Sequence, residues 1–159
     1  MTDLDREVNI KTIVNDDPSI LDECNKKLYE IAAKVYSKLG VGHTEFIYHR
    51  AMEIELRNNN YCFETEKRIV ITYVDDNDVL YTLGEERIDL YIHDKNCPTI
   101  IELKSVIKTS TTPKENEVSQ VYKYYRELPN TKYGIIINFP QSGAKQSKNT
   151  IDFCQIKLF

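Results

Sequence analysis

The chain has 159 residues, of which 41% are hydrophobic and 29% charged, and its formal net charge is −4. These values are typical of one globular domain, and no apolar run approaches the roughly 20 residues of a membrane-spanning helix. The net negative charge argues against a protein that coats nucleic acid by bulk attraction. Acidic residues predominate as far as Glu102 and basic residues after it, which predicts a positive lobe beside acidic strands.

The first 16 residues are polar and irregular, which is typical of a flexible N-terminal extension, and residues 17–159 are expected to form a single domain. Asp17 followed by Pro18 is a helix start. Apolar residues then recur at spacings of three and four, so a helix is predicted that ends at Gly40.

A second helix is predicted from Thr44, a capping residue, to about Asn58. Glu45, Tyr48 and Met52 share one stripe of this helix, so we expect the carboxylate to face inward. A solvated Glu near a helix N-terminus is the alternative, because the helix dipole stabilises a negative charge there.

The hydrophobic period changes to two from Glu66 onward, which predicts strands. Residues 68–74 and 79–83 are expected to form a hairpin around an Asp-rich turn, and Gly84 is expected to separate it from a strand at 86–93. Another strand is predicted at 99–104, and a polar loop follows at 105–111.

The sequence Thr112-Pro113-Lys114-Glu115 has the pattern of a capping box and predicts a third helix, which Pro129 ends. Residues 133–139 are apolar throughout, as in a buried central strand, and residues 142–150 form a polar loop. Residues 151–159 alternate weakly and are expected to form an edge strand. This order of elements predicts an α/β fold with a mixed central β-sheet flanked by α-helices.

Three charged residues, Asp89, Glu102 and Lys104, lie in strands that are otherwise apolar. Burying an unpaired carboxylate costs on the order of several kcal/mol, so such residues usually share a metal, an ion pair or a catalytic task. Mg²⁺ binds oxygen ligands of this kind, and the Leu103 carbonyl is a further candidate ligand. Lys104 could orient or deprotonate a water, or neutralise charge on a phosphate. A buried ion pair without chemistry explains the spacing equally well.

Asp89…Glu102-Leu103-Lys104 resembles the D…ExK signature of the PD-(D/E)XK nuclease superfamily. The run Gly42-His43-Thr44-Glu45-Phe46-Ile47-Tyr48 matches the GxxExxY motif that names one of its subgroups. The similarity continues through Ala51–Arg57, Gln120 and Ile135–Phe139, and it spans roughly residues 20–139. It implies a restriction-endonuclease-like core that hydrolyses phosphodiester bonds with Mg²⁺ or Mn²⁺.

The resemblance implies a role for each matching residue. Asp89 and Glu102 would bind the metal, Glu45 would add a carboxylate, and Lys104 would act on the attacking water. Gln120 would orient Lys104 or touch the phosphate backbone. Relatives commonly carry a His three residues before this Gln, where the present chain has Glu117, and the match is poor after Phe139.

Several residues outside this motif are weighed as well. The four cysteines form no CxxC pair and no zinc-site spacing, so we expect reduced thiols in an intracellular, cytoplasmic or nuclear protein; no signal peptide is visible. His93 could line the site, although a packing or surface role suits each histidine better. Tyrosines of the third helix could stack on bases or belong to the core. The candidates for contact with nucleic acid are Lys108, Lys114, Lys123, Tyr124 and Arg126.

These observations predict a nuclease that depends on Mg²⁺ or Mn²⁺ and acts on DNA in preference to RNA. The main alternative is a weak or inactive nuclease-fold protein that binds nucleic acid or serves in an assembly, which the net negative charge and Glu117 favour. A third reading is a buried structural network, in which Mg²⁺ would not alter stability. A homodimer stays open.

Overall fold

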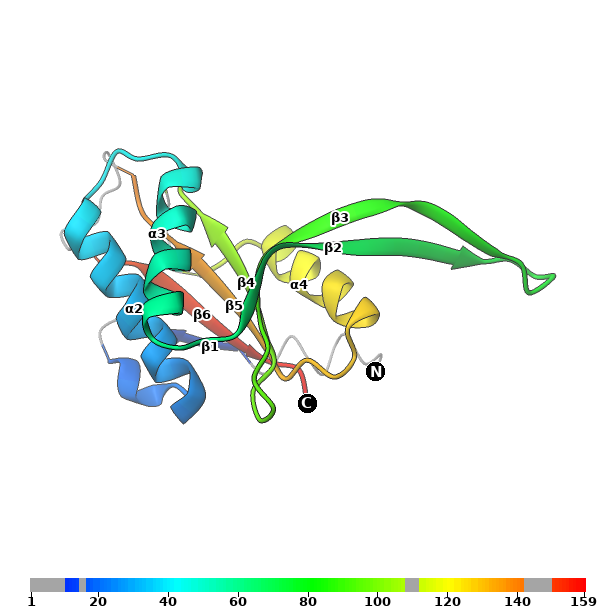
Figure 1. The fold of residues 1–159 in the computed structure, drawn as a ribbon, viewed down its shortest axis with the longest axis horizontal. Helices are drawn as coiled ribbons and strands as arrows, with labels where there is room; N and C mark the ends of the chain where they lie inside the picture. Colours follow the sequence, from blue (N-terminus) through cyan, green and yellow to red (C-terminus); the bar gives the residue numbers. More distant parts are fainter. Residues whose placement is uncertain (1–10, 15–16, 108–111, 142–149) are drawn as a thin grey trace.

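The computed structural model describes residues 11–14, 17–107, 112–141 and 150–159 (Figure 1). Its helices are the 3-10 helix η1 (Pro18–Ile20), α2 (Glu23–Leu39), α3 (Glu45–Asn58) and α4 (Glu115–Glu127). Its strands are β1 (Lys11–Val14), β2 (Phe63–Val74), β3 (Leu80–Ile92), β4 (Thr99–Lys104), β5 (Tyr133–Asn138) and β6 (Asp152–Lys157). The strands form one sheet in the order β1-β6-β5-β4-β3-β2, in which β4 and β5 are parallel and the other neighbours antiparallel.

Helices cover both faces of this sheet (Figure 1). On one face α2 and α3 bury a core that contains Leu28 and Tyr48 together with Ile101 and Phe153 of the sheet. On the other face α4 packs its apolar stripe against β5 and β6. The predicted α/β fold with a mixed, helix-flanked sheet is therefore confirmed. None of the described helices is long and apolar enough to cross a membrane.

Close packing of α4 depends on a glycine in β5. A Cβ atom placed on Gly134 would lie 2.3 Å from Cγ1 of Val121, a distance at which one of the two must shift. The absence of a side chain at this position therefore allows the helix to sit directly on the strand.

The N-terminal segment differs from the prediction in two ways. Lys11–Val14, expected within a flexible extension, form the edge strand β1 beside β6, and Val14 is 1% exposed. Their partner strand lies near the other end of the sequence, which no local pattern reveals. The predicted first helix is also interrupted, because Asp17 accepts a hydrogen bond from the Ser19 N–H (3.0 Å) and caps only η1, while α2 begins at Glu23.

The last strand, β6, was wrongly predicted to be an edge strand, because it lies between β5 and β1. Because Gln155 is polar, the sequence pattern of β6 does not indicate that the strand is buried. This side chain is fully buried, and its Oε1 accepts hydrogen bonds from Asn25 Nδ2 (2.7 Å) and the Asp22 N–H (3.0 Å). A buried polar side chain that is hydrogen-bonded weakens the apolar pattern without exposing the strand.

The third helix also begins later than predicted. Lys114 is its N-cap residue, and the Lys114 N–H donates to Oε1 of Glu117 at 2.8 Å. The proposed capping box at residues 112–115 is thus wrong, and Glu117 belongs to the actual one. Glu117 is also largely buried, so its carboxylate caps a helix rather than facing solvent.

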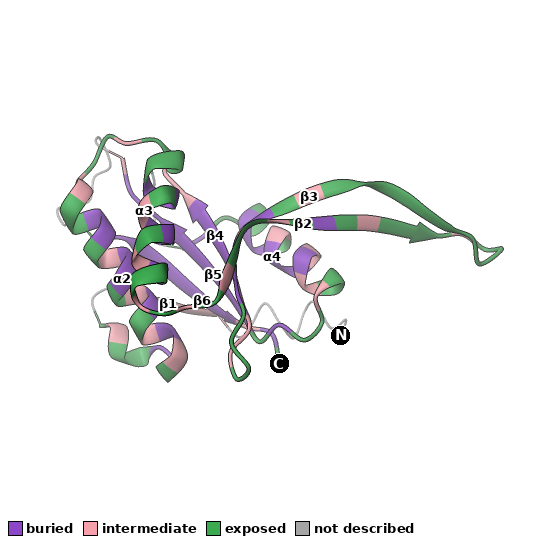
Figure 2. Cartoon of the chain, in the orientation of Figure 1, coloured by how far each residue is buried: buried purple, intermediate pink, exposed green. Residues whose placement is uncertain are grey.

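Strands β2 and β3 form a hairpin that projects well beyond the helices (Figure 1). The prediction that Gly84 separates two strands is wrong. Gly84 lies within β3 and pairs with Ile71 in a continuous ladder that shifts register at Ile71/Thr72. We call residues 70–85 the arm. Figure 2 shows that the arm is mostly exposed, in contrast to the buried strands of the body.

Candidate functional site

The candidate site lies where two neighbouring strands separate. β3 and β4 pair only where Leu90, Tyr91 and Ile92 face Ile101, Ile100 and Thr99. Toward the arm β3 leaves the sheet, while β4 continues beside β5 as far as Lys104. We call this point of separation the fork. At the fork Oδ2 of Asp89 accepts a hydrogen bond from the Leu103 N–H at 2.8 Å, so a side chain replaces the missing ladder partner.

Glu102 lies beside Asp89 in the fork and is 3% exposed. The two carboxyl groups share a side-chain hydrogen bond, whereas Oε1 of Glu102 is buried without any hydrogen-bond partner. Such an unpaired buried oxygen is rare in native proteins and indicates a site for an ion or a water. Lys104, half-buried at the end of β4, acts electrostatically on both carboxylates.

The electrostatics of this pair follow from burial. Loss of solvation, strengthened by the charge of Asp89 and opposed by Lys104, raises the pKa of Glu102 to about 9. Burial also raises the pKa of Asp89, against the effect of the Leu103 hydrogen bond. Without a cation the fork therefore holds fewer than two negative charges at neutral pH, and a cation would favour the doubly ionised form.

Glu45 lies at the rim of the site rather than inside it. Tyr48 and Met52 are fully buried as expected, but Glu45 is exposed, so the inward orientation predicted for it is wrong. Burial and the charge of Asp89 nevertheless raise the pKa of Glu45, while Lys104 opposes the shift. The carboxylate is thus within electrostatic reach of the fork.

The loop before α3 is tied to the end of β4, which brings Glu45 to the fork. Oγ of Ser105 donates to the His43 carbonyl at 3.1 Å, and the Tyr48 ring stacks on Phe139 with centroids 4.5 Å apart. Gly42 has a φ of +96°, a backbone conformation that favours glycine. The Gly and Tyr of the GxxExxY sequence therefore shape and anchor this loop, and its Glu lies at the rim of the site.

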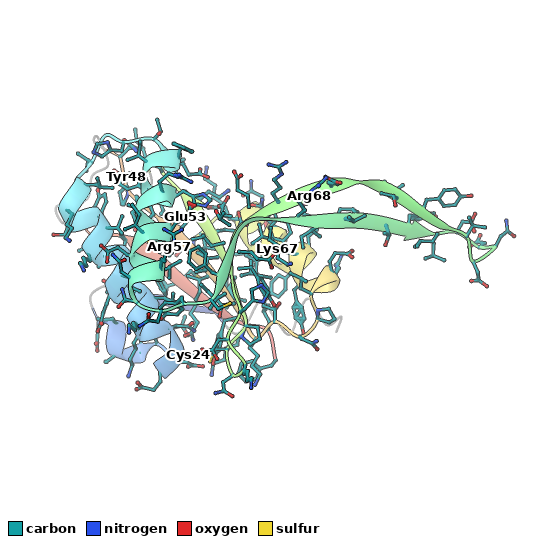
Figure 3. The ribbon with its side chains drawn as sticks, in the orientation of Figure 1. Cys24, Tyr48, Glu53, Arg57, Lys67 and Arg68 are labelled. Carbon is teal, nitrogen blue, oxygen red and sulfur yellow. The ribbon has the colours of Figure 1, made fainter. Side chains whose placement is uncertain are left out.

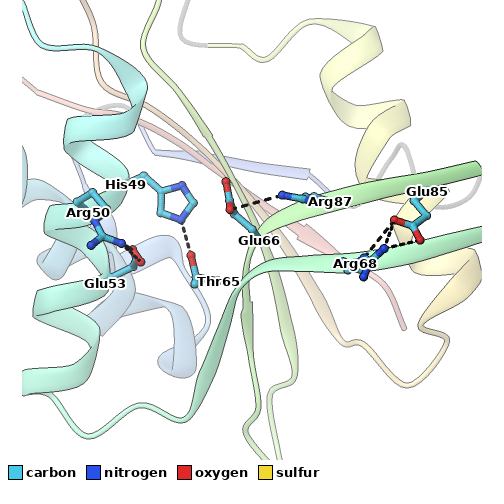
Figure 4. Close-up of polar contacts among 8 residues, drawn as sticks. All are labelled: His49, Arg50, Glu53, Thr65, Glu66, Arg68, Glu85 and Arg87. Atoms are coloured by element: carbon cyan, nitrogen blue, oxygen red, sulfur yellow. Dashed lines mark hydrogen bonds and ion pairs between the residues drawn. The ribbon is translucent and has the colours of Figure 1, made fainter.

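His49 also belongs to this region, although it is not among the residues predicted for the site. Nε2 of His49 lies 2.8 Å from Oγ1 of Thr65, as Figure 4 shows, and His49 acts electrostatically on Glu45 and Asp89. The spacing of Glu45 and His49, one helical turn apart, was the available signal. His93, in contrast, interacts with Glu64 at 2.6 Å.

Gln120 and Tyr124 of α4 brace the strand that carries Asp89. The Tyr124 hydroxyl donates to the Arg87 carbonyl at 3.0 Å and accepts from Nε2 of Gln120 at 2.9 Å. Tyr124 is 2% exposed and belongs to the core, which is the second of the two alternatives weighed for the tyrosines of this helix. Burial and the charge of Glu102 raise the pKa of Tyr124 to about 12. The contact of Gln120 that the structure records is thus with Tyr124 rather than with Lys104.

The remaining candidates for nucleic-acid contact lie along α4. Lys114 and Arg126 are exposed at its two ends. Nζ of Lys123 forms an ion pair with Oε2 of Glu86 at 2.6 Å, which offsets part of its charge. Lys108 lies outside the described residues.

The chemistry of the donor set fits a hard divalent cation. Within the described ranges, no group of three or more His, Cys, Asp or Glu side chains is arranged to hold a metal. Magnesium, however, usually takes one or two protein carboxylates and completes its shell with water and phosphate oxygens. Asp89 and the unpaired Oε1 of Glu102 supply such oxygens. In an extended strand the N–H and C=O of one residue point the same way, so the Leu103 carbonyl is directed toward the fork as well.

Comparisons with known proteins agree with this geometry. The model of a family described as the PD-(D/E)XK nuclease superfamily matches residues 22–150. A solved structure described as "Crystal structure of SSO0001" has a similar fold, with a TM-score of 0.53 and 18% sequence identity. The match covers 84% of this chain and 60% of that one, so this chain spans less than two thirds of that protein. No curated protein sequence matches the chain. Because the family model covers most of its length, the chain belongs to the PD-(D/E)XK nuclease superfamily.

Proposed function

We propose that this protein is a nuclease of the GxxExxY subgroup that requires Mg²⁺ or Mn²⁺ and hydrolyses phosphodiester bonds, in DNA rather than RNA. The observation that carries the proposal is the pair of half-buried Asp89 and buried Glu102 with Lys104 beside it. Two neighbouring carboxylates that are shielded from solvent destabilise a fold unless something offsets their charge. The choice of DNA rests on the restriction-endonuclease-like fold alone.

The site residues would divide the work as follows. Asp89 has its Oδ2 occupied by Leu103, so its other oxygen would hold the metal together with Glu102 and the Leu103 carbonyl. Glu45, at the rim, would contact the metal through water. The bound cation would supply positive charge that acidifies water and stabilises the additional negative charge on the phosphate.

Lys104 is the residue that would act on the attacking water. Its ammonium group, among three carboxylates, would orient the attacking water and neutralise charge that develops on the phosphate. In the reaction the water oxygen bonds to phosphorus and loses one proton. The bond from phosphorus to one ester oxygen breaks, and that oxygen gains one proton.

The proposal is tested by incubating the protein with labelled single- and double-stranded DNA and with RNA, in Mg²⁺, in Mn²⁺ and in chelator. Asp89→Asn, Glu102→Gln and Lys104→Ala are each expected to lower cleavage by roughly a hundredfold or more. Glu55→Gln is the matched control, because Glu55 is a half-buried carboxylate that pairs with Lys34 on α2 at 3.1 Å. It should cleave like the wild type.

Titration calorimetry with Mn²⁺ separates the remaining readings. Asp89→Asn should lose metal binding, whereas Lys104→Ala should keep it and lose only turnover. Metal binding without cleavage by the wild type would contradict the nuclease and support the assembly module. If the wild type neither binds metal nor cleaves nucleic acid, the result would contradict a metal-dependent enzyme altogether.

The second candidate function, a nuclease-fold assembly module, is favoured by one observation. From Ile69 to Glu86, both included, the hairpin carries five acidic residues and no Lys or Arg. A surface of this charge beside the site repels a polyanion and suits a protein partner.

A further inference from the structure

The arm exposes several large apolar side chains. The exposed fractions are 44% for Val70, 57% for Tyr73, 56% for Val74, 64% for Leu80 and 65% for Leu83. Val74 pairs with Leu80 and shares one face of the hairpin with Val70, whereas Tyr73 lies on the other face. Exposed large apolar side chains concentrated on one element indicate an interaction site. A two-stranded hairpin alone is also only marginally stable in water, so the arm gains most from a partner that covers it.

Among the residues that the structure describes, no strand pairs with the outer edge of β2. β2 is the last strand of the sheet, with β3 on one side only. Its stretch Ile69–Val74 contains no charge, Gly or Pro. Natural edge strands usually carry Lys, Pro or a bulge that prevents pairing with another chain. This stretch carries β-branched and aromatic residues, which favour strand pairing. At the register shift between Ile71 and Thr72 the extra residue is Leu83 of β3, so β2 itself has no inserted residue.

The charges that flank this stretch are opposite at its two ends. Lys67 and Arg68 precede it, at the point where the arm leaves the body (Figure 3). Asp75, Asp76 and Asp78 follow it in the turn at the tip. The tip and the stretch carry no basic residue, so neither the phosphates of a nucleic acid nor an anionic lipid surface suits them.

We infer that the outer edge of β2 is a homodimer interface, at which β2 of one copy pairs antiparallel with β2 of a second copy. A two-fold axis near Ile71 or Thr72 sets each acidic turn beside Lys67 and Arg68 of the other copy. Parallel pairing would bring like charges together instead. The sequence of this edge is thus complementary to itself, as a two-fold symmetric interface requires.

The contacts that these charges make within the chain do not prevent such pairing. Arg68 binds Glu85 at 2.6 Å (Figure 4) and Lys67 binds Glu64 at 2.8 Å. Both ion pairs are at the surface, where such pairs contribute little to stability and rearrange readily. Asp76 and Asp78 are exposed in the turn that joins β2 and β3.

The test measures assembly alone, so it is independent of the proposed nuclease activity. Sedimentation velocity of the full chain from about 1 to about 100 µM should show a concentration-dependent dimer. Val70→Lys/Val74→Lys should weaken the dimer at least about tenfold, because two charges enter its edge. Ile20→Lys/Ile54→Lys is the matched control, since these residues are each 52% exposed but lie on η1 and α3. Asp76→Lys/Asp78→Lys should also weaken the dimer, whereas Glu30→Lys on α2 should not.

Cross-linking locates the axis. In Ile71→Cys or Thr72→Cys the new thiol would lie close to the same thiol of the second chain across the axis. Diamide, which takes up the two thiol hydrogens, should then link the two chains by a disulfide bond. Ile54→Cys and the wild type, with its exposed Cys62, give the background. A wild type that stays monomeric at every concentration would overturn the inference. So would a dimer that none of the arm substitutions weakens, and so would arm substitutions that reduce DNA binding while assembly is unchanged.

Discussion

At the scale of single residues, the protonation of Glu102 couples the site to the stability of the fold. Its pKa is raised from an ordinary 4.5 to about 9, mainly by burial. At a pH between 4.5 and about 9, Glu102 has lost its proton in the unfolded chain but keeps it in the folded chain. The free energy of unfolding therefore falls as pH rises, by at most about 1.4 kcal/mol per pH unit, and the stabilisation is complete only below the lower value.

This coupling gives a prediction for Glu102→Gln. In chelator the wild type should lose stability steadily between about pH 5 and pH 9, whereas the variant should lose less over this range and be more stable by roughly 2 kcal/mol near pH 8. Urea unfolding at several pH values measures both. Adding Mg²⁺ near pH 8 should stabilise the wild type and not the variant. If Mg²⁺ leaves the wild type unchanged, Asp89, Glu102 and Lys104 form the structural network without metal.

At the scale of elements, the contact between α4 and β5 sets how α4 braces the fork. Gly134→Ala should destabilise the protein by roughly 1–3 kcal/mol, because the new methyl group overlaps Cγ1 of Val121. Gly84→Ala is the matched control, since nothing lies within 4 Å of a Cβ at that strand position. Unfolding in urea compares the two. Val121→Ala in the Gly134→Ala background should recover part of the loss, and failure to do so would show that the overlap is not its cause.

At the scale of the whole molecule, the sheet order joins segments that are far apart in the sequence. β6 separates β1 from β5, so removing residues 151–159 would leave β1 without a partner, expose one edge of β5 and open the core. This truncation should abolish cooperative unfolding. Removing residues 1–16 deletes the edge strand β1 and should leave a folded protein that is less stable by about a few kcal/mol, since Val14 leaves the core. Loss of folding in the shorter chain would contradict the prediction that residues 17–159 form a complete domain.

The same distinction explains what the sequence could predict. Strong local patterns in the sequence predict helices α2 and α3 and strands β4 and β5, and the fold class follows from these elements. The candidate site follows from the spacing of Asp89, Glu102 and Lys104. β1 and the interior position of β6 depend on pairing between distant segments, which local patterns do not contain. The burial of Tyr124 and the proximity of His49 depend on how α4 and α3 pack beside the fork. The length of the arm does not follow from the sequence, because a glycine such as Gly84 predicts a break in a strand, whereas here it pairs with Ile71.

One hydrogen bond at the fork has a kinetic consequence. The Leu103 N–H is bonded to the Asp89 carboxylate, whereas the neighbouring amides of the sheet are bonded to backbone carbonyls. Backbone amides in a ladder exchange their hydrogen for deuterium only when the sheet opens. The Leu103 amide can exchange whenever one side chain moves. Its exchange rate therefore reports the order of the site itself, separately from the stability of the strands that carry it.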